Sequence, residues 1–254
     1  MPYREKRIFS GRYLEIEIYP ITPQEKRQKR KEKLRQTRPK QKNLNDKNAK
    51  KHLTRLINTN FDRSDLAVHL TYDDTHLPRD ETQARRDIAN YIRRIKTLRK
   101  RASLPELKYI AVIECREPKS GRSAVRIHHH IIMSGGIDRD AVEKQWGRGR
   151  ANADRLKPDE TGFTGLAKYL TKDPKGTKRW CQSKNLKQPK IEVTDSKWTK
   201  RKAERAAQER DEERIRTEYP GYFLTEWVQE SNDICGGIYM YLKLRRLEGV
   251  NRKE

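Results

Sequence analysis

Apolar and polar residues recur along this chain at two periods, and each period predicts a different kind of element. The range Tyr13–Tyr19 (YLEIEIY) alternates apolar with acidic residues, which predicts a half-buried strand that ends at Pro20. The range Glu81–Arg101 carries isoleucines at helical spacing and predicts a long helix with a basic outer side. Further strands are expected at Asp65–Tyr72, Leu107–Glu114, Val125–Met133, Ala151–Leu156, Tyr222–Val228 and Ile238–Leu244. Further helices are expected from Asn45 or Asp46 to Ile57, from Asp138 to Trp146, from Asp159 or Thr161 to Lys172, and from Lys197 to Thr217 after a cap at Asp195 or Ser196.

The order of these elements favours an α+β fold. Strands and helices do not alternate as they do in a doubly wound parallel sheet, so we expect an antiparallel sheet with helices packed on it. Hydrophobic residues make up 33% of the 254 residues, which is enough for one modest core with long polar excursions.

The charge of the chain indicates that this α+β protein binds polyanions. The formal net charge is +24, and such an excess is tolerated best beside nucleic acid. No apolar run approaches a membrane span and no signal peptide opens the chain, so we expect no membrane partner. The three cysteines are far apart and form no C-x-x-C pair, which is typical of a protein of the reducing cytoplasm.

Positive charge is densest between Glu25 and Lys42, where ten Lys or Arg face two Glu. We interpret this range as a basic N-terminal arm that lies on phosphates, with Arg27, Arg30 and Lys31 among its DNA contacts. The alternative is a solvated linker.

Candidate chemistry is concentrated in the strand expected at Val125–Met133. Side chains alternate between the faces of a strand, so His128 and His130 project together while His129 points the other way. Two imidazoles side by side form half of a metal site. Two alternatives would also explain three consecutive histidines: a fortuitous polar run, or buried histidines that form hydrogen bonds to backbone carbonyls.

Glu114 ends the preceding strand and is a candidate third ligand. If it lies opposite Arg126 or His128 in an antiparallel pair, it shares the face of His128 and His130. A slip of one residue would send it to the other face and leave it as an exposed charge at the strand end. Two imidazoles and a carboxylate would suit Mn²⁺ or Mg²⁺, with positions left for phosphate oxygens.

Tyr169 and Lys172 follow three residues apart on one face of an expected helix. A phenol is protonated at neutral pH and is then a poor nucleophile, but a nearby ammonium favours the phenolate and holds a phosphate. Such a pair is also common in helices that have no catalytic role. His69 faces either this site or the core, and we assign it to the core.

These motifs occur together in a specific order. Over roughly residues 60 to 245 the chain resembles the HUH endonuclease superfamily, and within it the single-tyrosine rolling-circle replication initiators of bacterial plasmids, phages and integrative elements. The residues that carry the resemblance are Leu70-Thr71-Tyr72-Asp73, Glu114, Arg126-x-His128-x-His130, Lys168-Tyr169-x-x-Lys172, Trp180 to Pro189 and Gly236-Gly237-Ile238-Tyr239.

The resemblance implies a central antiparallel sheet of about five strands that carries the metal ligands His128, His130 and Glu114. It implies Tyr169 as the nucleophile and Lys172 as its electrostatic helper, giving a 5′-phosphotyrosine and a free 3′-hydroxyl. We expect Arg126 and Lys168 to contact the DNA. One departure is His129, because the family usually has an apolar residue there; His129 either packs behind the sheet as a neutral imidazole or weakens the assignment of the metal pair.

The predicted organisation has four parts: an N-terminal strand segment at 1–24, the basic arm with a short helix at 25–60, a catalytic domain at 61–245 that includes a charged helix at 195–217, and a basic tail at 246–254. The predicted function is metal-dependent, sequence-specific nicking and joining of single-stranded or hairpin origin DNA, which starts rolling-circle replication. A host helicase or polymerase is a further candidate partner, and the charged helix at 195–217 would bind either the DNA or such a host protein. The alternatives are a relaxase or a single-tyrosine transposase with the same chemistry, and a non-catalytic basic protein that binds nucleic acid.

Overall fold

A computed structural model describes residues 2–21, 39–116, 125–170, 179–210, 212–232 and 237–247. The chain divides into two compact units, each with its own antiparallel sheet. The first unit comprises Met1–Thr59, Glu160–Gly162 and Gln188–Glu254, and the second comprises Asn60–Asp159 and Phe163–Lys187. The expected α+β class, with an antiparallel sheet flanked by helices, is confirmed.

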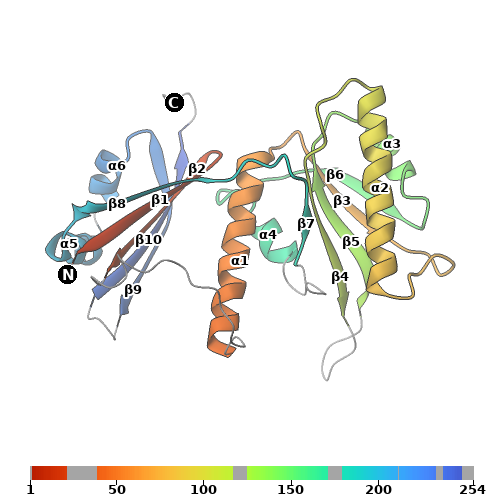
Figure 1. The fold of residues 1–254 in the computed structure, drawn as a ribbon. Coiled ribbons are helices and arrows are strands. Elements are labelled where there is room, and N and C mark those ends of the chain that lie inside the picture. The colour runs from red at the N-terminus through yellow and green to blue at the C-terminus, as the bar shows by residue number, and fades with distance from the viewer. Residues whose placement is uncertain are drawn as a thin grey trace. The chain divides into compact units, whose positions relative to one another are not determined.

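The sheet of the first unit has the strand order β8-β1-β2-β10-β9 (Figure 1). Its leading hairpin turns at Gly11, whose φ of +60° favours glycine and whose Cβ would lie 2.0 Å from the carbonyl oxygen of Asn58. The strands are β1 (Tyr3–Ser10), β2 (Tyr13–Pro20), β8 (Lys190–Trp198), β9 (Tyr222–Asn232) and β10 (Gly237–Arg246).

The two faces of this first sheet have different chemistry. Leu14, Ile16 and Ile18 face the short helices α5 (Lys200–Glu209) and α6 (Glu212–Glu218) in one apolar cluster. The opposite face is charged, and Arg55 of helix α1 (Pro39–Asn60) donates to Glu15 and Glu17 there at 2.7 to 2.9 Å. The alternation of apolar and acidic residues in β2 therefore separates a dry face from an ion-paired one.

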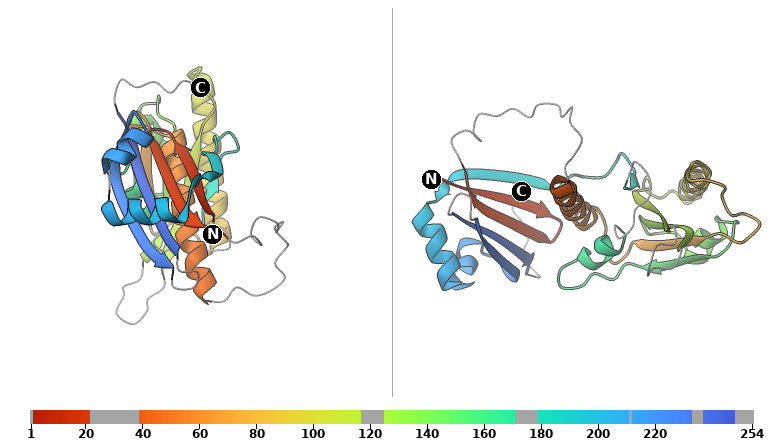
Figure 2. Two further views of the ribbon diagram at one scale, coloured as in Figure 1. Left: turned by 90° about the vertical axis from the view of Figure 1, so that its left-hand side faces the viewer. Right: turned by 90° about the horizontal axis from the view of Figure 1, so that it is seen from below.

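The second unit carries the histidine strand at the centre of a five-stranded sheet with the order β6-β3-β5-β4-β7. Helix α2 (Glu81–Arg101) covers one face, α4 (Thr164–Leu170) lies on the other, and α3 (Arg139–Lys144) precedes β6 (Figures 1 and 2). The strands are β3 (Leu66–Thr71), β4 (Tyr109–Arg116), β5 (Val125–Met133), β6 (Ala151–Arg155) and β7 (Cys181–Gln182).

Helix α2 has the bounds that its periodicity predicts. The Asp80 side chain accepts the backbone N–H of Gln83 at 2.7 Å and so caps the helix, and basic residues occupy its last turn. Its apolar stripe, which includes Ile88, Ile92 and Ile95, packs on the sheet in the main core of this unit. This core shields the face of the sheet under α2 from solvent.

The predicted helix at Lys197–Thr217 is wrong in its first part and in its continuity. Residues up to Trp198 form strand β8, and Thr199, not Asp195 or Ser196, caps α5 by accepting the N–H of Lys202. A left-handed residue, Arg210 with φ of 45°, then separates α5 from α6. Within 190–198 the alternation of apolar and polar residues extends only over Ile191-Glu192-Val193, which is too short to predict a strand beside the charged run that follows.

Three other expectations need correction. Strand β1 was missed, because Tyr3–Ser10 mixes charges with few apolar residues. Helix α1 begins at Pro39, within the range predicted as the arm, so the arm is shorter and the helix longer than expected. Strand β10 pairs in the first sheet, not in the sheet of the histidines. Within the described part of the chain, no helix is both long enough and apolar enough to cross a membrane.

Candidate metal and nucleophile site

The register of the second sheet brings the predicted ligands together. Strand β5 lies between β3 and β4, and Glu114 of β4 is directly opposite His128. His130 is two residues along β5, so its side chain leaves the same face as that of His128. The register condition that the sequence left open is therefore met, and Glu114 shares the face of both histidines.

The donor atoms converge on one point. The Nε2 atoms of His128 and His130 lie 3.0 Å apart, and one oxygen of Glu114 lies 3.4 and 3.2 Å from them. Two ligands at right angles around an ion with bonds of about 2.1 Å are about 3.0 Å apart, so these spacings suit a single small divalent ion. The residues present fit such an ion.

The hydrogen bonds and burial of the two rings suit metal ligation. The Nδ1 of His128 lies 2.8 Å from the carbonyl oxygen of Arg126, which can only accept, so this nitrogen carries the proton and Nε2 keeps its lone pair. Burial, together with the neighbouring His128 and His69, lowers the pKa of His130 to about 3. A neutral imidazole is the form that binds a metal.

His69 belongs to this site, so its assignment to the core is wrong. It pairs with His130 across β3 and β5, and the two rings stack with centroids 4.7 Å apart. The ligand nitrogens of His69, His128 and His130 all lie within 4.8 Å of one another. The signal for this was present in the sequence, because Leu66, Val68 and Leu70 alternate with His69 and are the core side of β3.

His129 packs behind the sheet, which is one of the two interpretations that the sequence left open. Its side chain is buried, its Nε2 lies 2.7 Å from the hydroxyl of Tyr72, and its ring contacts Trp146. Burial, and the nearby imidazoles of His128 and His69, lower the pKa of His129 to about 3, which keeps the ring neutral. His129 therefore fills the apolar position of the motif as an uncharged packing residue.

Tyr169 lies on the same side of the sheet as His128 and His130. Helix α4 is anchored by the buried residues Ala167 and Leu170, and Tyr169 projects from it with 52% of its surface exposed. Its ring meets that of His130 at a centroid distance of 5.0 Å and an angle of 77°. The solvent-accessible phenol of Tyr169 therefore lies next to the donor atoms of the proposed metal site.

The remaining predicted residues are placed as follows. Lys168 is exposed on α4 beside Tyr169. Arg126 extends from β5 on the histidine face, 48% exposed, and forms an ion pair of 2.7 Å with Asp74. Lys172, the predicted helper, and the arm residues Arg27, Arg30 and Lys31 lie outside the described residues.

Comparison with known protein families gives a match over part of the chain. Residues 65–174 match the family model of the replication-associated protein ORF2/G2P. The match covers less than half of the 254 residues, but it spans β3, the ligands of β4 and β5, and Tyr169 of α4. Searches of curated proteins and of solved structures found no match. The family match supports a replication initiation protein.

Proposed function

We propose that this protein is a metal-dependent endonuclease that nicks and rejoins single-stranded origin DNA through a 5′-phosphotyrosine, and so initiates rolling-circle replication. The observation that carries the proposal is the contact of Tyr169 with His130 on the face where His128 and Glu114 also converge. A nucleophile and a metal site for phosphate must lie this close for one phosphodiester to reach both.

The donor set determines the cofactor that we propose. Glu114, His128 and His130 would hold a divalent ion, Mn²⁺ or Mg²⁺, and His69 adds a further nitrogen within reach. When bound, the ion would polarise the scissile phosphate as a Lewis acid. The imidazoles favour Mn²⁺, because nitrogen ligands suit it better than they suit Mg²⁺.

The side chains carry the rest of the reaction. The phenol oxygen of Tyr169 attacks the phosphorus and forms the new P–O bond, while its proton passes to solvent. The bond from phosphorus to the 3′-oxygen breaks, and that oxygen takes a proton to become a free 3′-hydroxyl. Lys172, three residues further along the chain, is the proposed cation that favours the phenolate. Attack by a 3′-hydroxyl on the phosphotyrosine reverses the step and rejoins the strand.

The substrate that we propose is single-stranded or hairpin DNA of the replication origin, bound by Arg126, Lys168 and the basic arm. A host helicase or polymerase would extend the free 3′-hydroxyl. The match to a replication-associated family favours this function over a relaxase or transposase with the same chemistry.

Covalent capture tests the proposal. Single-stranded hairpin oligonucleotides from the non-coding DNA beside the gene are incubated with the protein and Mn²⁺, and the products are separated on a denaturing gel. We expect a protein–DNA adduct that is absent with a chelator and with Tyr169→Phe, and present with the control Tyr222→Phe in the other unit. An adduct that persists in Tyr169→Phe contradicts the mechanism. DNA binding with no adduct on any origin hairpin favours a non-catalytic binding protein.

A further inference from the structure

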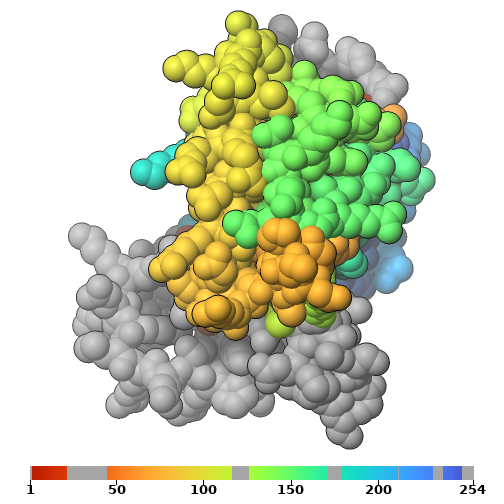
Figure 3. Space-filling model, turned by 90° about the vertical axis from the view of Figure 1, so that its right-hand side faces the viewer, coloured from red at the N-terminus to blue at the C-terminus, as the bar shows by residue number. Residues whose placement is uncertain are grey.

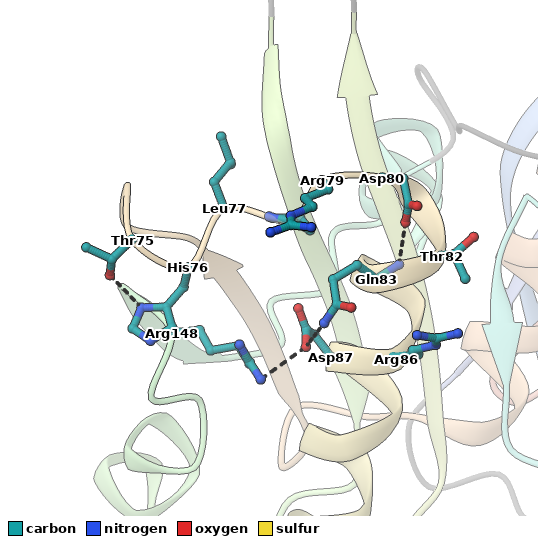
Figure 4. A pocket seen from close by; sticks show the side chains of 11 residues that line it. Thr75, His76, Leu77, Arg79, Asp80, Thr82, Gln83, Arg86, Asp87 and Arg148 are labelled. Carbon is teal, nitrogen blue, oxygen red and sulfur yellow. Dashed lines mark hydrogen bonds and ion pairs between the residues drawn. The ribbon is translucent and has the colours of Figure 1, made fainter.

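A polar pocket of about 400 Å³ lies at the N-terminal end of α2, away from the site described above (Figure 4). Its lining comes from the loop before α2, the first turns of α2 and the loop after α3. Helix α2 covers the face of the sheet opposite to His128 and His130, so the pocket is separate from the metal site.

The pocket has an excess of positive charge. Arg79, Arg86 and Arg148 line it against two carboxylates, of which Asp80 caps α2 and Asp87 pairs with Arg148. Arg79 and Arg86 are exposed, and among the described residues neither has a carboxylate partner. Two unpaired guanidinium groups, with Thr82 in the same lining, form a site for phosphate oxygens.

Arg148 is held in place at the back of the pocket. Its backbone carbonyl accepts the N–H of Asp73 at 3.0 Å. The next residue, Gly149, has φ of +137°, and a Cβ there would lie 2.5 Å from the backbone nitrogen of Asp73. Only glycine allows the loop to approach so closely, and the approach fixes the position from which Arg148 reaches into the pocket.

The carboxylate that pairs with Arg148 links the pocket to the strand of the histidines. Asp87 is buried and lies 3.2 Å from Arg148, and it also accepts from Gln83 at 3.1 Å. Its other oxygen is 3.4 Å from the hydroxyl of Tyr72, which in turn contacts His129. The pocket is therefore built on a buried polar network that ends at His129, on the face of β5 opposite to His128 and His130.

The loop that forms the mouth of the pocket also contacts the histidine face. Asp74 of this loop pairs with Arg126, which precedes His128 on β5, while Thr75 and Arg79 of the same loop line the pocket. The loop and the start of α2 form one continuous surface at the end of the helix (orange in Figure 3). A strand that passes Arg126 can follow this loop to the pocket.

We infer that this pocket binds a phosphate group, carried by the DNA strand outside the cleavage site or by a free nucleotide. The DNA source rests on the proposed function, whereas the phosphate site itself does not. Arg79 and Arg86 supply the charge that is free to bind, and Arg148 supplies a third donor that is already held by Asp87.

Binding measured without cleavage separates this inference from the nuclease proposal. All variants carry Tyr169→Phe and are measured in a chelator, so no nicking is needed. Anisotropy of a labelled single-stranded oligonucleotide is recorded over a range of salt concentrations, and equilibrium dialysis measures radiolabelled dAMP and inorganic phosphate. The test variant is Arg79→Ala/Arg86→Ala, and the control is Lys96→Ala, an exposed charge about 15 Å further along α2.

We expect the double variant to bind the oligonucleotide about tenfold more weakly at 0.1 M salt, with a salt slope lower by about 0.7, because the contact to one phosphate is lost. The Lys96 variant keeps the slope of the parent. If only dAMP binding falls, the pocket is a free-nucleotide site, which supports the phosphate site and excludes the strand as its source. If neither ligand distinguishes the double variant from the parent, the inference is overturned. Because Arg79 and Arg86 are exposed, loss of the fold does not complicate this result.

Discussion

The ring of Tyr169 meets the ring of His130 edge to face, although the two residues come from different elements, α4 and β5. The contact places an exposed phenol beside three donor atoms that lie within 3.4 Å of one another. This relationship can be tested apart from any DNA chemistry.

Bound Mn²⁺ should broaden the signal of Tyr169 selectively. In protein labelled with 3-fluorotyrosine, the paramagnetic ion at the histidines relaxes the nearest of the 11 tyrosines most strongly. We expect the ¹⁹F signal that disappears in Tyr169→Phe to be the first that Mn²⁺ removes. Diamagnetic Mg²⁺ should leave it sharp, and His130→Ala should protect it. Equal broadening of all tyrosines would mean that the ion binds elsewhere.

The three consecutive histidines should separate into two that bind metal and one that packs. We expect His128→Ala and His130→Ala each to weaken Mn²⁺ binding at least tenfold and to abolish nicking, while salt-dependent DNA binding is largely kept. His129→Leu, the matched control on the other face, should retain metal binding and nicking. Calorimetric titration with Mn²⁺ measures the first effect and the covalent-adduct gel the second. DNA binding lost in step with nicking would mean that His128 and His130 hold the fold instead.

His69 should raise metal affinity without being essential for it. Its ligand nitrogen lies within 4.8 Å of those of His128 and His130. However, β3 pairs with one edge of β5, whereas β4, which carries Glu114, pairs with the other edge. We expect His69→Ala to weaken Mn²⁺ binding about tenfold, and to affect Mg²⁺, which prefers oxygen ligands, far less. His76→Ala, which removes a histidine bonded to Asp73 in the neighbouring loop, is the control. Unchanged Mn²⁺ affinity in His69→Ala would exclude His69 from the coordination sphere.

The basic arm should contribute to DNA affinity through charge alone. We expect Arg27→Gln/Arg30→Gln/Lys31→Gln to lower the salt slope of single-stranded DNA binding by up to about 2, since each lost phosphate contact contributes about 0.7. The control variant Arg27→Lys/Arg30→Lys/Lys31→Arg conserves the charge and should bind as the parent does. An unchanged slope in the Gln variant would remove these residues from the interface.

Glu5 should make the first unit sensitive to acid. Burial opposes ionisation of this carboxyl, but the hydrogen bonds from Trp198, Tyr219 and Arg7 outweigh it and lower the pKa of Glu5. A lowered pKa in the folded state means that the ionised carboxylate stabilises the fold above about pH 4.3, the unfolded value, and that this stability is lost as the pH falls through the folded pKa.

We therefore expect Glu5→Gln to lower the free energy of unfolding by about 2 kcal/mol at pH 7 and by less at pH 3. Urea denaturation at the two pH values measures the difference. Glu230→Gln, at an exposed position of β9, should change neither value. A loss that is equal at pH 3 and pH 7 would assign the effect to packing and not to charge.

Several elements could be predicted from local sequence because a single segment contains the whole signal. Helix α2 has its predicted bounds, since its apolar residues recur at helical spacing from Ile88 to Leu98 and Asp80 precedes the first turn. Strand β5 and the opposite directions of His128 and His129 follow from side-chain alternation alone. Local signals failed where charge masks the period, as in β1 and β8, and where β8 runs directly into the charged helix α5.

The complete site could not be predicted from local sequence patterns alone. The sequence determined that two histidines share a face, that a carboxylate ends the preceding strand and that a tyrosine follows on a helix. Only the tertiary structure decided that Glu114 pairs with His128 and not with a neighbour one residue away, that His69 joins them, and that α4 presents Tyr169 to this face. The physical reason is that periodicity is a property of one segment, whereas register and the choice of face are set by hydrogen bonds and core packing between segments distant in the chain.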